Sequence, residues 1–182
     1  METYRIHTDA SVYYVTYSVV QWLPVFVTED ACQIVTDSLA WCHTHKGLRI
    51  NAYVIMPTHM HAIFFDHQFD SARLAATLAA FRRHSGKALC EYAASHLPPC
   101  FSRTLANSAR TDRRRQFWQH TRHPIGLASK SLWEQKLQYL HDNPRRKGLV
   151  RYPEDWRFFS ARHYLHGKDE GQEVTISPID WP

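Results

Sequence analysis

The sequence lacks several features that would place the protein in a membrane or an oxidising compartment. The four cysteines contain no Cys-x-x-Cys pair, and we therefore expect reduced thiols and an intracellular protein. Residues 1–9 are polar, without the positive region and apolar core of a secretory signal. No run is long or apolar enough to span a membrane. These absences predict a soluble, cytoplasmic protein.

The composition indicates a folded, basic chain. The 182 residues are 44% hydrophobic, which is ordinary for a globular domain with a core. The formal charge is +5 without counting 13 histidines, and the sequence pI is about 9.1. Such a charge suggests a polyanionic partner, of which nucleic acid is the plainest. With no internal repeat or linker, we predict one domain over 1–182, with a core of about 10–165 and a basic C-terminal tail.

Strand and helix patterns alternate along the first hundred residues. A run rich in β-branched and aromatic residues predicts a strand over 12–20. A helix is expected from Thr28, as its N-cap, to Gly47, which would stop it. A hairpin follows over 48–66, and a second helix over 69–96.

The second half of the chain is less regular. Residues 100–115 are polar and basic without periodicity, and we expect a mobile loop or arm there, although a plain solvated surface fits the same pattern. Residues 117–118 and 125–127 are expected to flank a last strand. A helix capped by Ser129 or Ser131 should then run to Asn143 and end at Pro144.

The hairpin carries the most informative motif, His59-Met60-His61. Side chains alternate along a strand, so the two imidazoles should share one face while Met60 anchors the other. Paired imidazoles on a strand make half of a metal site. A lone histidine is more often a packed or surface residue, and the motif gains weight only with further ligands.

The helix before Pro144 supplies the groups that such a site would need. Tyr139 and Asn143 are four residues apart and share a face, and Lys136 lies one turn before Tyr139. A tyrosine nucleophile acting on a phosphodiester needs a metal beside the phosphate and a nearby cation, because a free phenol has a pKa near ~10. Trp133, Leu137 and Leu140 fall on another face and should pack on the sheet.

These motifs together resemble the single-tyrosine endonuclease superfamily. The match is carried by AYVIMPTHMHAIF at 52–64, FWQ at 117–119 and KLQYLHDNPRRKGLVRYPEDWRFFSARHYL at 136–165. It is closest to the IS200-like transposases, and among them to the REP-associated tyrosine transposases. Thr58 stands where Asn is usual before the first histidine, and Arg145-Arg146 stand where Val with a basic residue is common.

The resemblance implies an α+β fold, with the ferredoxin-like antiparallel sheet of HUH endonucleases flanked by helices. It implies that His59, His61 and Asn143 bind Mg²⁺ or Mn²⁺ and that Tyr139 is the nucleophile, with Lys136 as a catalytic helper. The activity would be single-stranded DNA cleavage and strand transfer at REP-like hairpins through a 5′-phosphotyrosine, as in DNA transposition and recombination. The candidate DNA-binding residues are Arg82, Arg83, Lys87, Arg113, Arg114, Arg115, Arg145 and Arg146.

Two other functions remain open from the sequence. One is a hairpin-binding regulator that has lost cleavage, and the other is a metal-dependent hydrolase in which Tyr139 is structural. The resemblance also leaves open a monomer or a homodimer, associated with the nucleoid.

Overall fold

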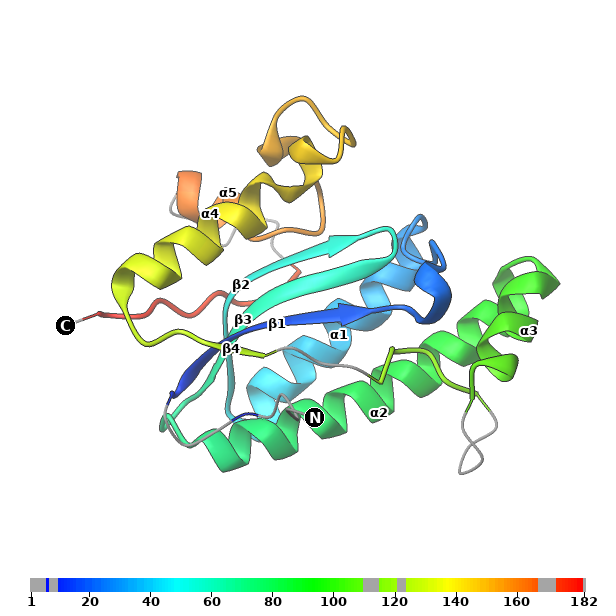
Figure 1. Cartoon of the computed structure of the whole chain (residues 1–182), viewed down its shortest axis with the longest axis horizontal. Helices are drawn as coiled ribbons and strands as arrows, with labels where there is room; N and C mark the ends of the chain where they lie inside the picture. The colour runs from blue at the N-terminus through cyan, green and yellow to red at the C-terminus, as the bar shows by residue number, and fades with distance from the viewer. Residues whose placement is uncertain (1–5, 7–9, 110–114, 121–123, 167–172, 182) are drawn as a thin grey trace.

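The computed structural model describes residues 6, 10–109, 115–120, 124–166 and 173–181. Its centre is a four-stranded antiparallel sheet with the strand order β2-β3-β1-β4. Helices α1 and α2 cover one face of the sheet, and α4 lies across the other (Figure 1). The predicted α+β fold with an antiparallel sheet is confirmed.

The strands are β1 (Val12–Ser18), β2 (Leu48–Met56), β3 (His59–Asp66) and β4 (Ile125–Gly126). The predicted hairpin is present, with β2 and β3 joined at Pro57-Thr58. β1 lies antiparallel to β3, and its Thr16 is directly opposite His61. The alternation of side chains therefore divides each strand between two chemically different faces.

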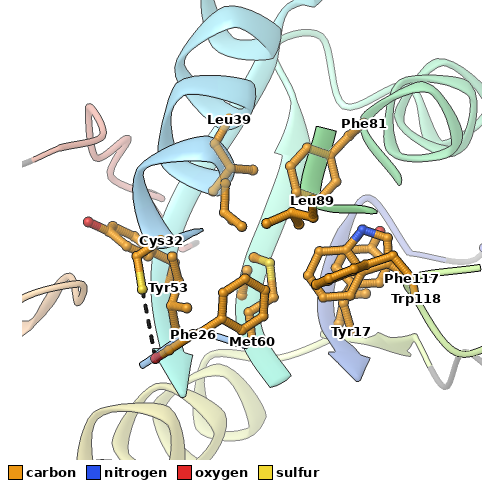
Figure 2. Packing of buried hydrophobic residues seen from close by; sticks show 14 of the residues in the cluster. Tyr17, Phe26, Cys32, Leu39, Tyr53, Met60, Phe81, Leu89, Phe117 and Trp118 are labelled. Atoms are coloured by element: carbon orange, nitrogen blue, oxygen red, sulfur yellow. Dashed lines mark hydrogen bonds between the residues drawn. The ribbon is translucent and has the colours of Figure 1, made fainter. Parts of the chain in front are cut away.

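The larger core lies between the sheet and helices α1 (Glu29–Lys46) and α2 (Ser71–His96). Figure 2 shows Met60 and Tyr17 from the sheet meeting Leu39 of α1 and Phe81 of α2, with Trp118 beside Tyr17. Because these side chains are almost completely buried, this face is the main source of hydrophobic stabilisation.

The ends of α1 differ in part from the prediction. Thr28 occupies the N-cap position with extended backbone, but its hydroxyl bonds the Tyr92 hydroxyl at 2.9 Å and makes no bond to the helix N-terminus. The hydroxyl therefore links α1 to α2 where a local cap was expected. Gly47 ends the helix as predicted, at a φ of 69° that favours glycine.

The expected loop over residues 100–115 is wrong for its first half. Residues Pro99–Asn107 form α3, which begins with a proline at its first helical position and buries Leu105. Packing of this apolar residue on α2 stabilises a helix that the polar local sequence does not predict. Residues 110–114 lie outside the described residues.

Helix α4 (Lys130–Arg146) begins at the predicted cap, because the Ser129 hydroxyl accepts a bond from the Leu132 amide at 3.3 Å. Its predicted end at Pro144 is wrong, since the helix continues to Arg146. Asn143 and Pro144 are both buried, so packing on the sheet outweighs the loss of one helical hydrogen bond at the proline. Leu140 is buried and Trp133 and Leu137 pack beside it, as expected.

The remaining elements are short. They are the 3-10 turns η1 (Val20–Trp22) and η2 (Pro153–Asp155) and the helix α5 (Ala161–His166). Among the described residues, no helix combines the length and hydropathy needed to cross a bilayer.

Candidate active site

His59 and His61 begin strand β3 and face the side of the sheet that α4 covers, while Met60 between them enters the α1/α2 core. The two imidazole centroids are 4.8 Å apart. His61 is only 7% exposed, whereas His59, the first residue of the strand, is half-buried. The strand therefore presents two adjacent ring nitrogens toward one space, as the alternation predicts.

Each imidazole is held by a threonine hydroxyl. Thr16 Oγ1, on the neighbouring strand, lies 2.8 Å from His61 Nδ1, and Thr58 Oγ1, in the hairpin turn, lies 2.9 Å from His59 Nδ1. If each Nδ1–H donates to its threonine, Nε2 retains the lone pair needed to bind a metal. Contacts of this kind fix the ring orientation and tautomer of metal-binding histidines.

Both rings are neutral at physiological pH. Burial lowers the pKa of His59 to about 4, with a smaller contribution from the Lys147 ammonium. Burial lowers the pKa of His61 to about 3, with a smaller contribution from His59. A neutral imidazole is the form that binds a metal, so protons do not compete for these nitrogens near pH 7.

Tyr139 of α4 lies directly beside this pair. Its ring centroid is 5.9 Å from that of His61, in an edge-to-face arrangement, and the residue is 42% exposed. Tyr14 of β1 stacks on His61 at 5.5 Å and meets Tyr139 edge-on at 6.5 Å. Burial raises the pKa of Tyr14 well above its usual value, although the Thr16 hydroxyl opposes this. Tyr14 is therefore the neutral, packed phenol of the site and Tyr139 the accessible one.

Asn143 lies between two residues of the chain that interact with the histidine pair, Tyr139 through a ring contact and Lys147 through its charge. Tyr139, one turn earlier, is beside His61, and Lys147, one turn later, acts electrostatically on His59. Asn143 is buried, and its Nδ2 has no hydrogen-bond partner among the described residues. A buried amide without a partner is costly, and the two amide atoms can exchange positions by a flip. The amide oxygen can therefore face the histidines as a ligand.

Three cations surround the tyrosine. The Arg146 guanidinium lies over the Tyr139 ring at 5.1 Å, and the Lys136 ammonium lies over the Tyr14 ring at 5.6 Å. Arg145 is exposed and paired with Asp142 at 2.6 Å. Arg146 and Lys136 thus each place positive charge over one of the two phenol rings of the site.

Comparisons with known proteins point to one fold. No family model and no curated protein matches the sequence. A solved structure of a REP-associated tyrosine transposase bound to a REP hairpin aligns over 100% of this chain and 92% of its own, with 18% identity and a TM-score of 0.65. The chain has the fold of that transposase. A presumed transposase from Deinococcus radiodurans R1 aligns over 78% of this chain and 97% of its own, with 17% identity and a TM-score of 0.45.

The basic residues expected to bind DNA divide between the two faces of this transposase fold. Arg145 and Arg146 are on α4 beside the site, whereas Arg82, Arg83 and Lys87 are on α2, across the sheet. Arg82 donates a 2.6 Å hydrogen bond to the Gln119 carbonyl and lies over the Tyr17 ring. Arg83 and Lys87 are exposed. Of the five, only Arg145 and Arg146 are on the helix that carries Tyr139.

The remaining predicted arginines lie near the α2/α3 end. Arg115 is exposed and donates a 3.4 Å hydrogen bond to the Cys90 carbonyl. Arg113 and Arg114 fall outside the described residues, and their predicted role stays a prediction.

The donor set fits a hard or borderline divalent cation. The described residues contain no cluster of three His, Cys, Asp or Glu side chains, so the third protein donor has to come from another residue type. Asn143, buried one helical turn after Tyr139, could be such a donor. Two nitrogens and one amide oxygen suit Mn²⁺, and also Mg²⁺ with waters and phosphate oxygens in the remaining positions.

Sequence reasoning did not single out three residues of the site: Tyr14, Thr16 and Trp22. Tyr14 and Thr16 share the strand face of His61, and a period-two reading of residues 12–18 paired with β3 could have found them. Trp22 is exposed and meets the His59 ring edge-on at 5.9 Å. It lies in an irregular turn, which no periodic pattern predicts.

Proposed function

We propose that the protein is a metal-dependent endonuclease and strand transferase that acts on single-stranded DNA at hairpins, with transposition-type chemistry. The observation that carries this proposal is the position of Tyr139. An accessible phenol lies beside two neutral, threonine-held imidazoles, and a buried amide, Asn143, follows it one turn later on the same helix. These positions support a phosphodiester transfer reaction in which Tyr139 is the nucleophile and the neighbouring groups bind the phosphate.

In the proposed reaction, the Tyr139 oxygen attacks the phosphorus and loses its proton to solvent. The bond from phosphorus to the 3′ oxygen breaks, and that oxygen takes up a proton to give a free 3′-OH. The phosphorus stays bonded to the 5′ oxygen of the strand on the 3′ side of the break, so that strand is now attached to Tyr139 through a 5′-phosphotyrosine. Attack by a 3′-OH on this phosphotyrosine reverses the step, so strands are rejoined without ATP.

Each side chain has a role in this scheme. His59, His61 and Asn143 would hold the cation, which when bound supplies Lewis-acid stabilisation of the phosphate. Thr16 and Thr58 orient the imidazoles, and Tyr14 fixes the His61 ring by stacking. Arg146, over the Tyr139 ring, and Lys136, over the Tyr14 ring, neutralise non-bridging phosphate oxygens.

A DNA hairpin is the substrate that best fits the fold and the charge. The structure of similar fold with a TM-score of 0.65 is described as bound to a REP hairpin. The basic charge of this chain suits the DNA backbone, which supplies most of the sequence-independent affinity. Such an enzyme would act in the cytoplasm, on exposed single strands of the nucleoid.

The proposal is tested with a hairpin oligonucleotide that carries a single-stranded flank and a different fluorophore at each end. In the presence of Mn²⁺ we expect an SDS-resistant protein adduct that retains only the 3′-terminal label, and a free fragment that retains the 5′ label. Products with a free 5′-phosphate and no adduct would favour a hydrolase. Tight binding without cleavage in Mn²⁺ or Mg²⁺ would favour a hairpin-binding regulator.

A further inference from the structure

A polar pocket lies next to the histidine pair, between η1 and α3. Its volume is about 520 Å³, within the range of small-ligand sites. The described lining residues include no Asp, Glu, Lys or Arg, and four of the nine carry side-chain amides. Gln21, Trp22, Gln116 and Gln119 are among the lining residues.

Trp22 connects this pocket to the active site. It lines the pocket, and its ring also meets the His59 ring edge-on at 5.9 Å. The indole is 56% exposed although it is large and apolar. Gln21 and Trp22 both have a φ of 53°, a left-handed conformation that residues other than glycine rarely adopt. The chain therefore keeps a strained turn that presents an indole to solvent beside the proposed metal ligands.

Gln116, which lines the pocket, has a hydrogen-bond acceptor that no described residue uses. Gln116 is 8% exposed, and its Nε2 donates to the Trp118 carbonyl at 3.0 Å, which fixes the orientation of the amide. Its Oε1 is buried without a hydrogen-bond partner among the described residues. A buried acceptor in this state costs free energy unless a ligand or water supplies a donor.

Gln119 places a second amide in the same pocket. Its Nε2 donates to the Val19 carbonyl at 3.0 Å, so the acceptor Oε1 is the end of the amide left for a ligand. The pocket thus combines two amide oxygens, which accept hydrogen bonds, with an exposed indole, on which a flat ring can stack. It suits a flat, aromatic ligand with N–H donors on its edge, which is a description of a nucleobase.

We propose that this pocket binds one unpaired base of the DNA strand next to the cleavage site, and that it selects a base with an exocyclic amino group. The base stacks on Trp22 while its amino group donates to Gln116 Oε1. Adenine, cytosine and guanine carry such a group. Thymine presents one N–H between two carbonyl oxygens, which would face the amide oxygens of Gln116 and Gln119. This inference rests on the proposed function, because it assigns a specificity pocket to that active site.

The pocket is tested without cleavage, so that its failure is separate from failure of the proposed reaction. The Tyr139→Phe protein is titrated in EDTA with hairpin oligonucleotides in which 2-aminopurine replaces each flanking base in turn. We expect one position, near the cleavage site, at which binding quenches the 2-aminopurine fluorescence through stacking. No quenching at any position would overturn the proposal.

Two tryptophan variants separate this pocket from general binding. Trp22→Ala should remove the quenching and weaken binding of the oligonucleotide by roughly tenfold to a hundredfold, the usual effect of losing one stacking platform. Trp41→Ala is the matched control, because Trp41 is 51% exposed but lies on α1, across the sheet. Equal effects of the two substitutions would overturn the proposal.

The amino-group contact is tested from both sides. Replacing adenine at the quenched position by purine, which lacks the amino group, should weaken binding by about tenfold, as expected for a buried acceptor left unpaired. Gln116→Met should abolish this difference between adenine and purine. If Gln116→Met does not fold, the purine substitution alone decides, and equal affinity for the two bases would show that water alone occupies the acceptor.

If the wild-type protein forms no covalent adduct but the Trp22-dependent quenching persists, the proposed reaction fails and the pocket stands. If the adduct forms while purine and thymine bind as well as adenine at every flanking position, the reaction stands and the pocket is wrong.

Discussion

The two faces of the central sheet are made by the same strands but follow different physical rules. Toward α1 and α2 the sheet presents apolar side chains such as Met60, Tyr17 and Phe64, all essentially inaccessible to solvent. Toward α4 the same strands present His59, His61 and Tyr14 next to apolar neighbours. The apolar face therefore stabilises the fold. Burial of polar groups on the other face lowers the free energy of unfolding, which indicates that these groups are kept for function.

The largest effect is expected when a histidine on the α4-facing side of the sheet is exchanged for a residue that cannot bind the metal in the same way. His61→Gln should lower adduct formation by on the order of 10³, because several kcal/mol of transition-state stabilisation are lost with a metal ligand. Adduct formation is measured against time at saturating Mn²⁺. Circular dichroism should show that the variant remains folded, and unchanged adduct formation would remove His61 from the metal site.

Substitution of the neighbouring residue, Met60, should lower stability but leave adduct formation intact. Met60→Ala removes a fully buried side chain from the α1/α2 core and should lower the free energy of unfolding by about 2–5 kcal/mol. Urea denaturation measures this change, and the folded fraction should still form the adduct. A stable Met60→Ala protein that cannot form the adduct would show that the two faces are not separable.

A smaller effect should come from the threonine behind His61. Thr16→Val keeps the shape of the side chain but removes the hydroxyl that bonds His61 Nδ1, and should weaken Mn²⁺ binding by about 10–100-fold. Isothermal titration calorimetry measures this affinity. Thr44→Val on the exposed side of α1 is the control. If both variants bind Mn²⁺ equally well, Thr16 does not orient the ring.

A smaller effect is expected when the free energy of unfolding of the metal-free protein is measured as a function of pH. His59, His61 and His141 all have a pKa lowered by burial, to about 4, 3 and 4. As pH falls below about 6.5, the unfolded chain binds protons that the folded chain excludes, so the free energy of unfolding decreases until these pKa values are reached. Urea titrations between pH 7 and pH 5 should show this decline.

The α1/α2 face should respond at the other end of the pH scale. Burial raises the pKa of Cys32 to about 12 and of Cys42 and Cys90 to about 11. Above pH 9 the unfolded chain loses protons that the folded chain retains, so stability declines as pH rises. Cys90→Ala should reduce this alkaline decline, whereas the exposed Cys100→Ala should not. Equal alkaline curves for the two variants would contradict this assignment.

The sequence predicts the sheet, the hairpin and the relation of Tyr139 to Asn143 because these depend on local periodicity. The period of two places His59 and His61 on one face of a strand. The spacing of four places Tyr139 and Asn143 on one face of a helix. The continuation of α4 through Pro144 and the helix at Pro99–Asn107 were not predicted, because tertiary burial decides both. Trp22 was missed because a strained turn has no sequence period.

The assignment of Tyr139 can be measured directly. The adduct formed with Mn²⁺ and a hairpin oligonucleotide is digested with nuclease and protease, and the phosphorylated peptide is sequenced by mass spectrometry. We predict that the phosphate is on Tyr139, that Tyr139→Phe forms no adduct, and that Tyr152→Phe, which alters another exposed tyrosine, forms a normal one. A phosphate on any other residue, or an adduct that persists in Tyr139→Phe, would contradict the account.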